Sequence, residues 1–331
     1  MPALYTEVKI PKTQTVVAYQ SRMMFVGSCF ADNIGSMFAN AKFNCLINPL
    51  GTLYNPLSIK ILFDYLTTGK EIKENDFFQN NGKYSSYLMH GDFDNEDLSQ
   101  AVVSAKDSLN NASKFLKTAD VVFITLGTAF VYYLNENNQP VANCHKQNPK
   151  LFTRKMLTVE QSTEALQQIC RIITEYNPKI RIVLTVSPIR HIADGATDNT
   201  LSKSTLLLSA NQTAQTFSNV EYFPSYEIMI DELRDYRFYE SNLTHPSSTA
   251  REIIFERLLQ TYCTQQTIGA VSQVENFMKS VNHKIVSPNS PETLTFAKNQ
   301  IQKAMQLEAQ NIGLNLEKEK QYFNDIINRN K

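Results

Sequence analysis

One serine in this chain lies where a short apolar run meets a predicted helix. The run Met23–Val26 ends at Gly27 and Ser28, and apolar residues at helical spacing follow from Ile34. A serine in such a turn has an exposed hydroxyl, a backbone N–H that can stabilise an oxyanion, and the positive end of a helix nearby. These properties make Ser28 a candidate nucleophile. A serine at this place is also a frequent helix cap, and spacing alone leaves both roles open.

A histidine that could act as general base lies far along the chain. His245 stands in the sequence Asn-Leu-Thr-His-Pro, in a loop directly before a predicted helix. The proline that follows limits the backbone freedom of His245, which would help to aim its imidazole into a cleft. An ordinary surface-loop histidine is the alternative. His145 and His191 also follow predicted strands and are further candidates to line the site.

Metal and thiol chemistry are weaker alternatives. A metal-dependent phosphoesterase could use His145, His191 and His245, but none of them shows the i, i+4 pair or the Cys-x-x-Cys spacing of metal ligands. The sequence therefore predicts no metal. Cys29 could be a nucleophile at the helix start, but its side chain would point away from that of Ser28, and burial as a small apolar group is favoured. The run Asp231–Tyr239 could form a solvated face or contact a substrate.

The strand and helix pattern predicts an α/β fold. Two further apolar runs, Val121–Leu126 and Ile180–Val186, are typical of buried parallel strands, and an apolar helical stripe from Leu166 to Ile173 lies between them. Such units form right-handed crossovers. Sites in open parallel sheets lie at the carboxyl ends of the strands, so we expect Ser28, Thr128 and Ser187 along one edge.

Further elements complete the predicted domain and add an extension. We predict a domain over residues 1–264, with a turn-rich insertion at 75–107, and a C-terminal helical extension over residues 265–331. Because the extension is rich in Lys, Gln, Glu and Asn, we expect it to cover the domain or to form a homo-oligomer contact rather than to make a core of its own. The remaining predicted elements are helices at 202–216, 247–259, 265–280 and 291–330, a strand at 220–223, and a polar break at 288–291.

Composition limits the class of protein. The 331 residues are 42% hydrophobic and 19% charged, which is enough for a packed interior. Lys+Arg and Asp+Glu are both 32, so no overall field would attract nucleic acid. No run of about 18 apolar residues predicts a membrane span, and the first residues do not resemble a secretory signal. Five cysteines without close pairs fit reduced thiols, and we expect a cytoplasmic protein.

Five ordered segments resemble one family. Gly27-Ser-Cys-Phe-Ala31 spells the letters after which the GSCFA family is named, and that family looks like a branch of the SGNH, or GDSL-like, hydrolases. The resemblance covers about residues 20 to 260 and implies a flavodoxin-like three-layer α/β/α sandwich. The other segments similar to the family are Asn48–Pro56, Thr125–Thr128, Thr185–His191, and Tyr222–Glu227 running into Asp231–Tyr239.

The resemblance also implies roles for single residues. Ser28 matches the nucleophile of the first SGNH block, and Gly51 matches the oxyanion-hole glycine of the second. The third block normally reads Gly-x-Asn-Asp, whereas this chain has Gly-Thr-Ala-Phe from Gly127 and lacks the oxyanion Asn. Thr128, Asn143 or His145 could replace it.

The last block departs from the SGNH pattern as well. It normally reads Asp-x-x-His and here is Asn242-Leu-Thr-His245, so the base is present and the acid is an amide. In serine-protease triads, replacing this Asp by Asn lowers turnover by about 10⁴-fold. Some SGNH members are similar in using a dyad in which a backbone carbonyl holds the imidazole, and Asp231 or Asp235 could also reach it.

Together these residues predict acyl-ester hydrolysis or acyl transfer. His245 would take the Ser28 proton, and the N–H groups of Ser28 and Gly51 would hold the oxyanion. This mechanism needs no metal and no nucleotide cofactor. The implied substrate is a small ester, including an O-acylated carbohydrate. The alternative is a non-catalytic member that binds carbohydrate or takes part in assembly, because two blocks depart from the pattern.

Overall fold

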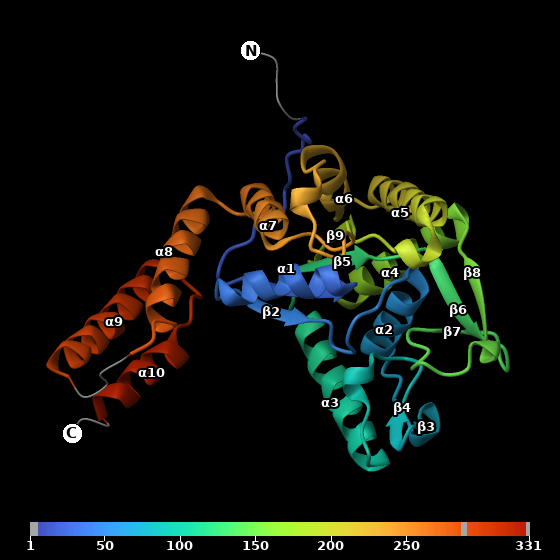
Figure 1. The fold of residues 1–331 in the computed structure, drawn as a ribbon, viewed down its shortest axis with the longest axis horizontal. Coiled ribbons are helices and arrows are strands. Elements are labelled where there is room, and N and C mark those ends of the chain that lie inside the picture. The colour runs from blue at the N-terminus through green and yellow to red at the C-terminus, as the bar shows by residue number, and fades with distance from the viewer. Residues whose placement is uncertain (1–5, 286–289, 329–331) are drawn as a thin grey trace. The chain divides into compact units, whose positions relative to one another are not determined.

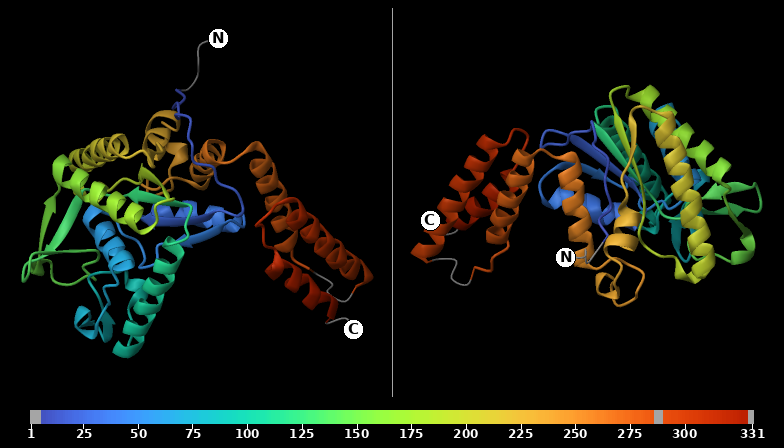
Figure 2. Two further views of the ribbon diagram at one scale, coloured as in Figure 1. Left: turned by 180° about the vertical axis from the view of Figure 1, so that it is seen from behind. Right: turned by 90° about the horizontal axis from the view of Figure 1, so that it is seen from above.

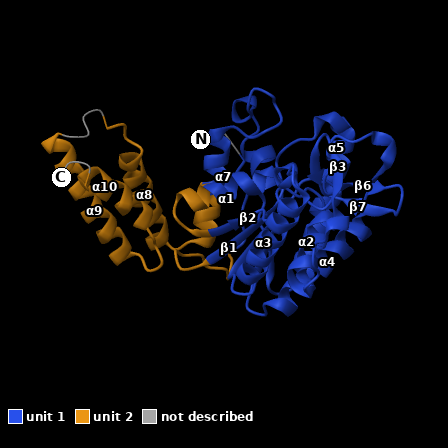
Figure 3. Ribbon diagram, turned by 90° about the horizontal axis from the view of Figure 1, so that it is seen from below, with its two compact units in different colours: residues 1–11, 22–36, 45–255 blue, residues 12–21, 37–44, 256–331 orange. Residues whose placement is uncertain are grey.

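The computed structural model describes residues 6–285 and 290–328. It divides into two compact units, coloured blue and orange in Figure 3. The sheet unit comprises residues 1–11, 22–36 and 45–255, and the helical unit comprises residues 12–21, 37–44 and 256–331. The helical unit thus takes in two short segments from the first part of the chain as well as its C-terminal part.

The sheet unit is built on a five-stranded parallel sheet with helices on both faces (Figures 1 and 2). The strand order is β10-β9-β5-β1-β2, which is the 2-1-3-4-5 order of flavodoxin-like folds. This confirms the predicted α/β sandwich. The order of the chain reverses between β1 and β5, which pair from Met23 with Val121 to Gly27 with Thr125. The strands are β1 (Arg22–Gly27), β2 (Asn44–Ile47), β5 (Val121–Leu126), β9 (Arg181–Val186) and β10 (Val220–Tyr222).

Alternating strand residues supply the two faces of the sheet. Met24, Val122 and Ile182 are fully buried in a core that also contains residues of four helices on the same face. On the opposite face, the rings of Phe25 and Phe123 stack with their centroids 4.8 Å apart, and helix α1 (Cys29–Asn40) packs against Phe25. The four helices of the first face are α2 (Pro56–Thr68), α3 (Leu98–Leu116), α4 (Val159–Tyr176) and α5 (Ala196–Thr216).

Two additions to the sheet unit were not predicted as strands. A three-stranded antiparallel sheet of order β7-β6-β8, which we call the accessory sheet, lies between β5 and α4 in the chain. A β3–β4 hairpin lies in the predicted turn-rich insertion. That insertion ends earlier than predicted, because Asp97 caps α3 through the Gln100 N–H at 2.9 Å and α3 starts at Leu98. The added strands are β3 (Phe78–Asn80), β4 (Lys83–Ser85), β6 (Phe130–Leu134), β7 (Gln139–Val141) and β8 (Phe152–Met156).

The helical unit has a small core, which the sequence did not predict. The side chains of Phe277, Leu316 and Phe323 are fully buried, and the rings of Phe277 and Phe296 lie 6.4 and 5.9 Å from that of Phe323. The prediction of an extension without a core is therefore wrong, because the few apolar side chains of three polar helices pack against one another. The helices are α7 (Ser248–Tyr262), which leads into the unit, α8 (Gln265–Val281), α9 (Pro291–Gln310) and α10 (Glu317–Asn328).

Two predicted helices have other bounds in the structure. The helix predicted over 291–330 is divided into α9 and α10 by a turn in which Gly313 has a φ of +90°. Helix α5 starts at Ala196 and not at Ser202. Residues 288 and 289 of the predicted polar break, and the end of the helix predicted to reach residue 330, lie outside the described residues. No helix within the described ranges is long and apolar enough to cross a bilayer.

A substitution at Gly27 tests the close pairing of β1 with β5. Gly27 has a φ of +137°, and a Cβ atom there would lie 2.1 Å from the backbone oxygen of Thr125, which cannot move away. We expect Gly27→Ala to lower the free energy of unfolding by about 3 kcal/mol or more, measured by chemical denaturation. Gly269→Ala in α8, which meets nothing within 4 Å, is the matched control and should be neutral or stabilising. Equal stability of Gly27→Ala and the wild type would contradict this packing.

Candidate active site

Ser28 lies in the turn between β1 and α1, at the carboxyl edge of the sheet. Its N–H donates to the Thr125 carbonyl at 3.1 Å, and its hydroxyl accepts a hydrogen bond from the Phe30 N–H at 3.3 Å. The residue is only 1% exposed, so the expectation of an exposed hydroxyl is wrong for this state, because the side chain turns toward the first turn of α1. In this state the hydroxyl therefore caps α1, which is the alternative role that the sequence left open. The turn nevertheless lies where the strand order reverses, and folds of this class bind ligands there.

Gly127 keeps space beside Ser28. A Cβ atom at Gly127 would lie 3.3 Å from Cβ of Ser28 and 3.0 Å from Cδ1 of Tyr54. The N–H groups of Gly127 and Thr128 donate to the Tyr54 carbonyl at 2.8 and 3.0 Å, which fixes Tyr54 to the end of β5. Because Gly127 has no side chain, Ser28 and the Tyr54 ring can both lie close to its Cα atom.

The predicted oxyanion donors already have acceptors. The Gly51 N–H donates to the Asn48 carbonyl at 2.8 Å, and Ser28 N–H is bonded to Thr125. Gly51 has a φ of +76°, and a Cβ atom there would lie 2.2 Å from that of His90, so the position requires glycine. Either N–H could stabilise an oxyanion only by sharing its hydrogen with the present acceptor.

Asn48 supports the Ser28 turn, a role that the sequence did not reveal. Its Oδ1 accepts a hydrogen bond from the Gly27 N–H at 2.8 Å, and its Nδ2 donates to Asp32 at 2.6 Å. Asn48 is buried. It thereby joins the segment after β2 to both the end of β1 and the first turn of α1.

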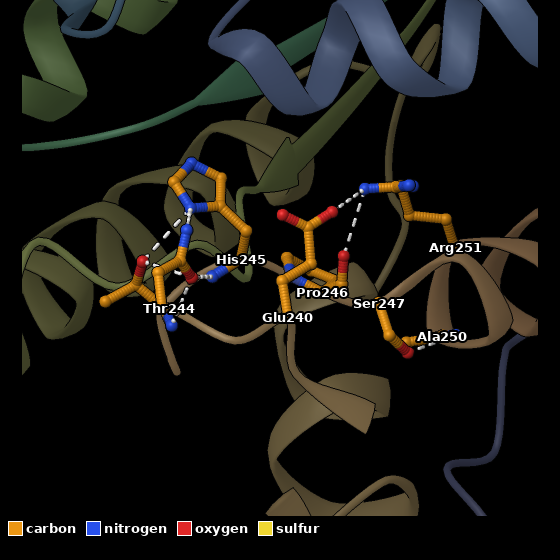
Figure 4. Close-up of polar contacts among 8 residues, drawn as sticks. Glu240, Thr244, His245, Pro246, Ser247, Ala250 and Arg251 are labelled. Carbon is orange, nitrogen blue, oxygen red and sulfur yellow. Dashed lines mark hydrogen bonds and ion pairs between the residues drawn. The ribbon is translucent and has the colours of Figure 1, made fainter. Parts of the chain in front are cut away.

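Asn242 and Thr244 both contact the Nδ1 side of the His245 imidazole, at 2.9 and 3.0 Å. Figure 4 shows Thr244 beside the ring. Oδ1 of Asn242 accepts hydrogen bonds from the backbone N–H groups of Thr244 at 3.0 Å and His245 at 3.1 Å, whereas the Thr244 hydroxyl lies 3.0 Å from both Asn242 Oδ1 and His245 Nδ1 and can donate to only one of them. These donors fix the orientation of the amide, so its Nδ2 faces Nδ1 of His245 at 2.9 Å. An amide N–H only donates, hence Nδ1 accepts, and the neutral imidazole carries its proton on Nε2.

The His245 loop is tied to the segment that follows β9. Arg190 N–H donates to the Thr244 carbonyl at 3.1 Å. His191, next along the chain, packs edge-to-face with Tyr54, their ring centroids 6.3 Å apart. Burial, with the charge of Lys203 as the next cause, lowers the pKa of His191 to about 4 against the opposing effect of Asp194, so this imidazole is neutral at physiological pH. Within the described residues, no hydrogen bond joins Ser28 to His245.

Lys203 is a buried residue of this edge that the sequence analysis did not single out. Its Nζ donates to the carbonyls of Gly127 at 2.6 Å and Ser187 at 2.7 Å, and the residue is 1% exposed. Burial lowers the pKa of Lys203 to about 7, with the neighbouring Cys29 acting in the opposite direction. A sequence signal was present, since Lys203 shares the helical face of Leu206 and Ala210, which are both fully buried.

The other predicted site residues fall into three places. Thr128 Oγ1 lies 3.1 Å from Oγ of Ser202 on α5, beside Lys203. Asn143 lines a pocket together with Tyr54. His145 follows β7 and is buried against the insertion, with Nε2 at 2.8 Å from the Ser86 carbonyl and Nδ1 at 3.4 Å from Asp94, and no described contact brings it to Ser28.

The alternatives to Ser28 and His245 find little support. Asp231 and Asp235 are ion-paired with Arg234 at 2.8 Å and Arg237 at 3.1 Å, and neither contacts His245 in the described part of the chain. Burial raises the pKa of the Cys29 thiol, which disfavours the reactive thiolate. Among the described residues, no three His, Cys, Asp or Glu side chains are grouped so that they could hold a metal ion.

Lys203 predicts a specific dependence of stability on pH. Its folded-state pKa of about 7 lies below the ordinary 10.5, so between these values the unfolded chain binds a proton that the folded chain does not. The free energy of unfolding should therefore rise with pH in this window, by up to about 1.4 kcal/mol per pH unit from this one group. We expect the difference between wild type and Lys203→Met, measured by urea denaturation, to grow in favour of wild type from neutral to alkaline pH. A difference that stays constant would contradict a buried, easily deprotonated Lys203.

Two family models match the chain in separate regions. The model of the GSCFA family matches residues 22–258, and that described as the GSCFA domain protein, C-terminal domain, matches residues 274–329. A search of curated proteins found no match. The first region contains Ser28, Gly127, Lys203 and His245, and the second lies within the helical unit.

Two solved structures resemble the chain weakly. One is an acetyl xylan esterase, Est2A, from the rumen bacterium Butyrivibrio proteoclasticus, at 12% identity over 75% of this chain and 64% of that chain, with a TM-score of 0.37. The other is a candidate platelet activating factor from Streptococcus pneumonia, at 11% identity over 75% of this chain and 85% of that chain, also with a TM-score of 0.37. The match thus spans less than two thirds of the esterase, and likeness of this size says nothing about activity. Because the first family model covers most of the chain, this protein belongs to the GSCFA family.

Proposed function

We propose that this protein is a serine-dependent acyl-ester hydrolase or acyltransferase of SGNH type, with Ser28 as nucleophile and His245 as base. The observation that carries the proposal is the place of Ser28, at the start of α1, where the strand order reverses, beside a glycine without a side chain. His245 supports it, because its loop is tied to the segment after β9 at the same edge. The proposed substrate is a small ester such as an O-acylated carbohydrate.

In the proposed reaction, Ser28 Oγ attacks the ester carbonyl carbon while His245 Nε2 takes the hydroxyl proton. The carbonyl oxygen becomes an oxyanion, to which the N–H groups of Ser28 and Gly51 donate. His245 then gives the proton to the leaving alcohol, and water or an acceptor alcohol removes the acyl group from Ser28. For the first step the Ser28 hydroxyl must leave the Phe30 N–H, which requires a rotation of its side chain.

Lys203 would favour the charge that develops in this reaction. Its Nζ donates to the carbonyl of Gly127, the neighbour of Ser28, at 2.6 Å, the residue is 1% exposed, and its pKa of about 7 leaves the ammonium on part of the protein at neutral pH. A fixed positive charge in a water-excluded site stabilises a nearby oxyanion more strongly than the same charge does in water. Lys203 thus acts through position and charge rather than through contact with the ester.

Asn242 opposes this reaction and should keep it slow. A base at Nε2 needs its proton on Nδ1, and Asn242 Nδ2 favours the reverse tautomer by donating to Nδ1. An aspartate at this position would accept a hydrogen bond from Nδ1–H and stabilise the imidazolium. The cost of such an amide in serine-protease triads is about 10⁴-fold in turnover.

The Asn242→Asp variant tests the proposal by a gain of reactivity. We expect a fluorophosphonate probe to label Ser28 at least about 100-fold faster in Asn242→Asp than in wild type, as followed by peptide mass spectrometry. Ser28→Ala should abolish labelling, and His245→Ala should abolish the gain. Asn111→Asp, which adds the same charge to an exposed position of α3, is the control and should label like wild type.

A second function is favoured by the same Asn242 contact. With its proton on Nε2, His245 can donate a hydrogen bond to a bound ligand, as in a non-catalytic protein that binds carbohydrate or takes part in assembly. Absence of Ser28 labelling in both wild type and Asn242→Asp from about pH 6 to 9, the range in which histidine bases work, would overturn the hydrolase and favour binding.

A further inference from the structure

We propose that a pocket next to the Ser28 turn binds the ring of a neutral carbohydrate, and that it is the substrate-binding part of the site if the proposed esterase function holds. The pocket has a volume of about 450 Å³. Volumes of this size are typical of small-molecule sites. Most of its lining comes from the accessory sheet and the segments joining its strands, and the rest from residues that follow β2 and from His90.

The large apolar side chains of the lining are aromatic, and Ala142, Cys144 and Pro149 add small apolar surface. Tyr54, Tyr132 and Phe152 line the pocket, and no Leu, Ile, Val or Met is among its lining residues. Tyr132 is 42% exposed, and its ring lies edge-to-face with Phe152, their centroids 6.4 Å apart. A fatty acyl chain would be expected to meet branched aliphatic side chains, whereas flat rings offer faces to a rigid ring with C–H groups. The lining therefore favours a ring over a chain.

The polar part of the lining offers hydrogen-bond donors. The amide oxygens of Asn143 and Gln147 accept bonds from His145 N–H at 2.8 Å and the Tyr87 hydroxyl at 3.0 Å. Their –NH₂ groups make no hydrogen bond within residues 6–285 and 290–328, so they are available for a ligand. The Thr52 hydroxyl oxygen is buried and has no partner of good geometry in the same residues. These groups suit the hydroxyl oxygens of a sugar.

The charge of the lining indicates a neutral ligand. No Lys, Arg, Asp or Glu is among the lining residues. Nδ1 of His90, which also lines the pocket, lies 3.0 Å from the Asp92 carboxylate. A phosphate or carboxylate would find no cation in contact with it, and an amine would find no carboxylate. An uncharged polyhydroxylated ring needs no charged partner and would therefore lose nothing by entering this pocket.

Tyr54 joins the pocket to the Ser28 turn. Its ring lines the pocket, and the same ring lies 3.0 Å from the point where a side chain at Gly127 would begin, next to Ser28. Tyr54 therefore lies between the pocket and Ser28, which is 1% exposed, and its ring would have to move aside for an acyl group on a bound sugar to reach the Ser28 hydroxyl. This places the carbohydrate on the alcohol side of the ester, as the leaving group.

Isothermal titration of the full chain carrying Ser28→Ala tests the pocket without turnover. The probes are methyl β-xylopyranoside and xylobiose, with octanoate and inorganic phosphate for comparison. We expect a sugar to bind and the two anions not to bind. Tyr132→Ala should weaken sugar binding by on the order of tenfold, as expected for the loss of one aromatic contact, and Tyr132→Phe should retain it. Tyr236→Ala, which removes a 76% exposed tyrosine elsewhere in the sheet unit, is the matched control.

The outcomes separate this proposal from the esterase proposal. Sugar binding that is lost in Tyr132→Ala supports the pocket even if Ser28 is never labelled by the fluorophosphonate. No sugar binding at millimolar concentration, equal binding by Tyr132→Ala in a folded protein, or preference for octanoate would overturn it, whatever Ser28 does. If both proposals hold, Tyr132→Ala should lower kcat/KM for an acetylated xyloside but not for p-nitrophenyl acetate.

Discussion

The candidate site depends on the close approach of β1 to β5 at their carboxyl ends. Gly27 has no side chain, so its backbone can lie against Thr125, and the Ser28 N–H continues the pairing to the Thr125 carbonyl. From the other side, Asn48 accepts the Gly27 N–H at 2.8 Å, and Leu53 N–H donates to the Gly27 carbonyl at 2.8 Å. The turn is therefore held between a neighbouring strand and the segment after β2, and Ser28 is left at the start of α1.

Two polar groups at this edge act in opposite directions. Lys203 has a buried amino group bonded to two carbonyls and to no carboxylate of the described chain, and because burying a charge is costly its pKa falls to about 7. Its charge favours an anion at Ser28. Asn242, by contrast, donates a hydrogen bond from Nδ2 to Nδ1 of His245, which favours the tautomer with its proton on Nε2. In that tautomer Nε2 has no free lone pair and cannot act as a base. In the proposed reaction, Lys203 would stabilise the intermediate while Asn242 would weaken the base, which predicts slow turnover or binding alone.

The sequence predicted the elements whose signals are local. Strands β1, β5 and β9 are continuous apolar runs that end at Gly or at Ser-Pro, and α4 has a clear apolar stripe. The accessory sheet has no such signal, since four of the five residues of β8, Thr153 to Met156, are exposed. In the site, a motif identified Ser28 and His245. Lys203 was missed because a lysine is expected at the surface, and the acceptors of the Gly51 and Ser28 N–H groups depend on contacts across the sheet.

The tautomer of His245 is the most direct test of this account, because the choice between slow turnover and binding depends on what Asn242 does to the imidazole. Two-dimensional ¹⁵N–¹H NMR of protein labelled at its histidine rings can assign the proton of each imidazole above its pKa. We predict that neutral His245 carries its proton on Nε2 in wild type and on Nδ1 in Asn242→Asp. A wild-type His245 with its proton on Nδ1 would contradict the account, because Asn242 would then not oppose the base.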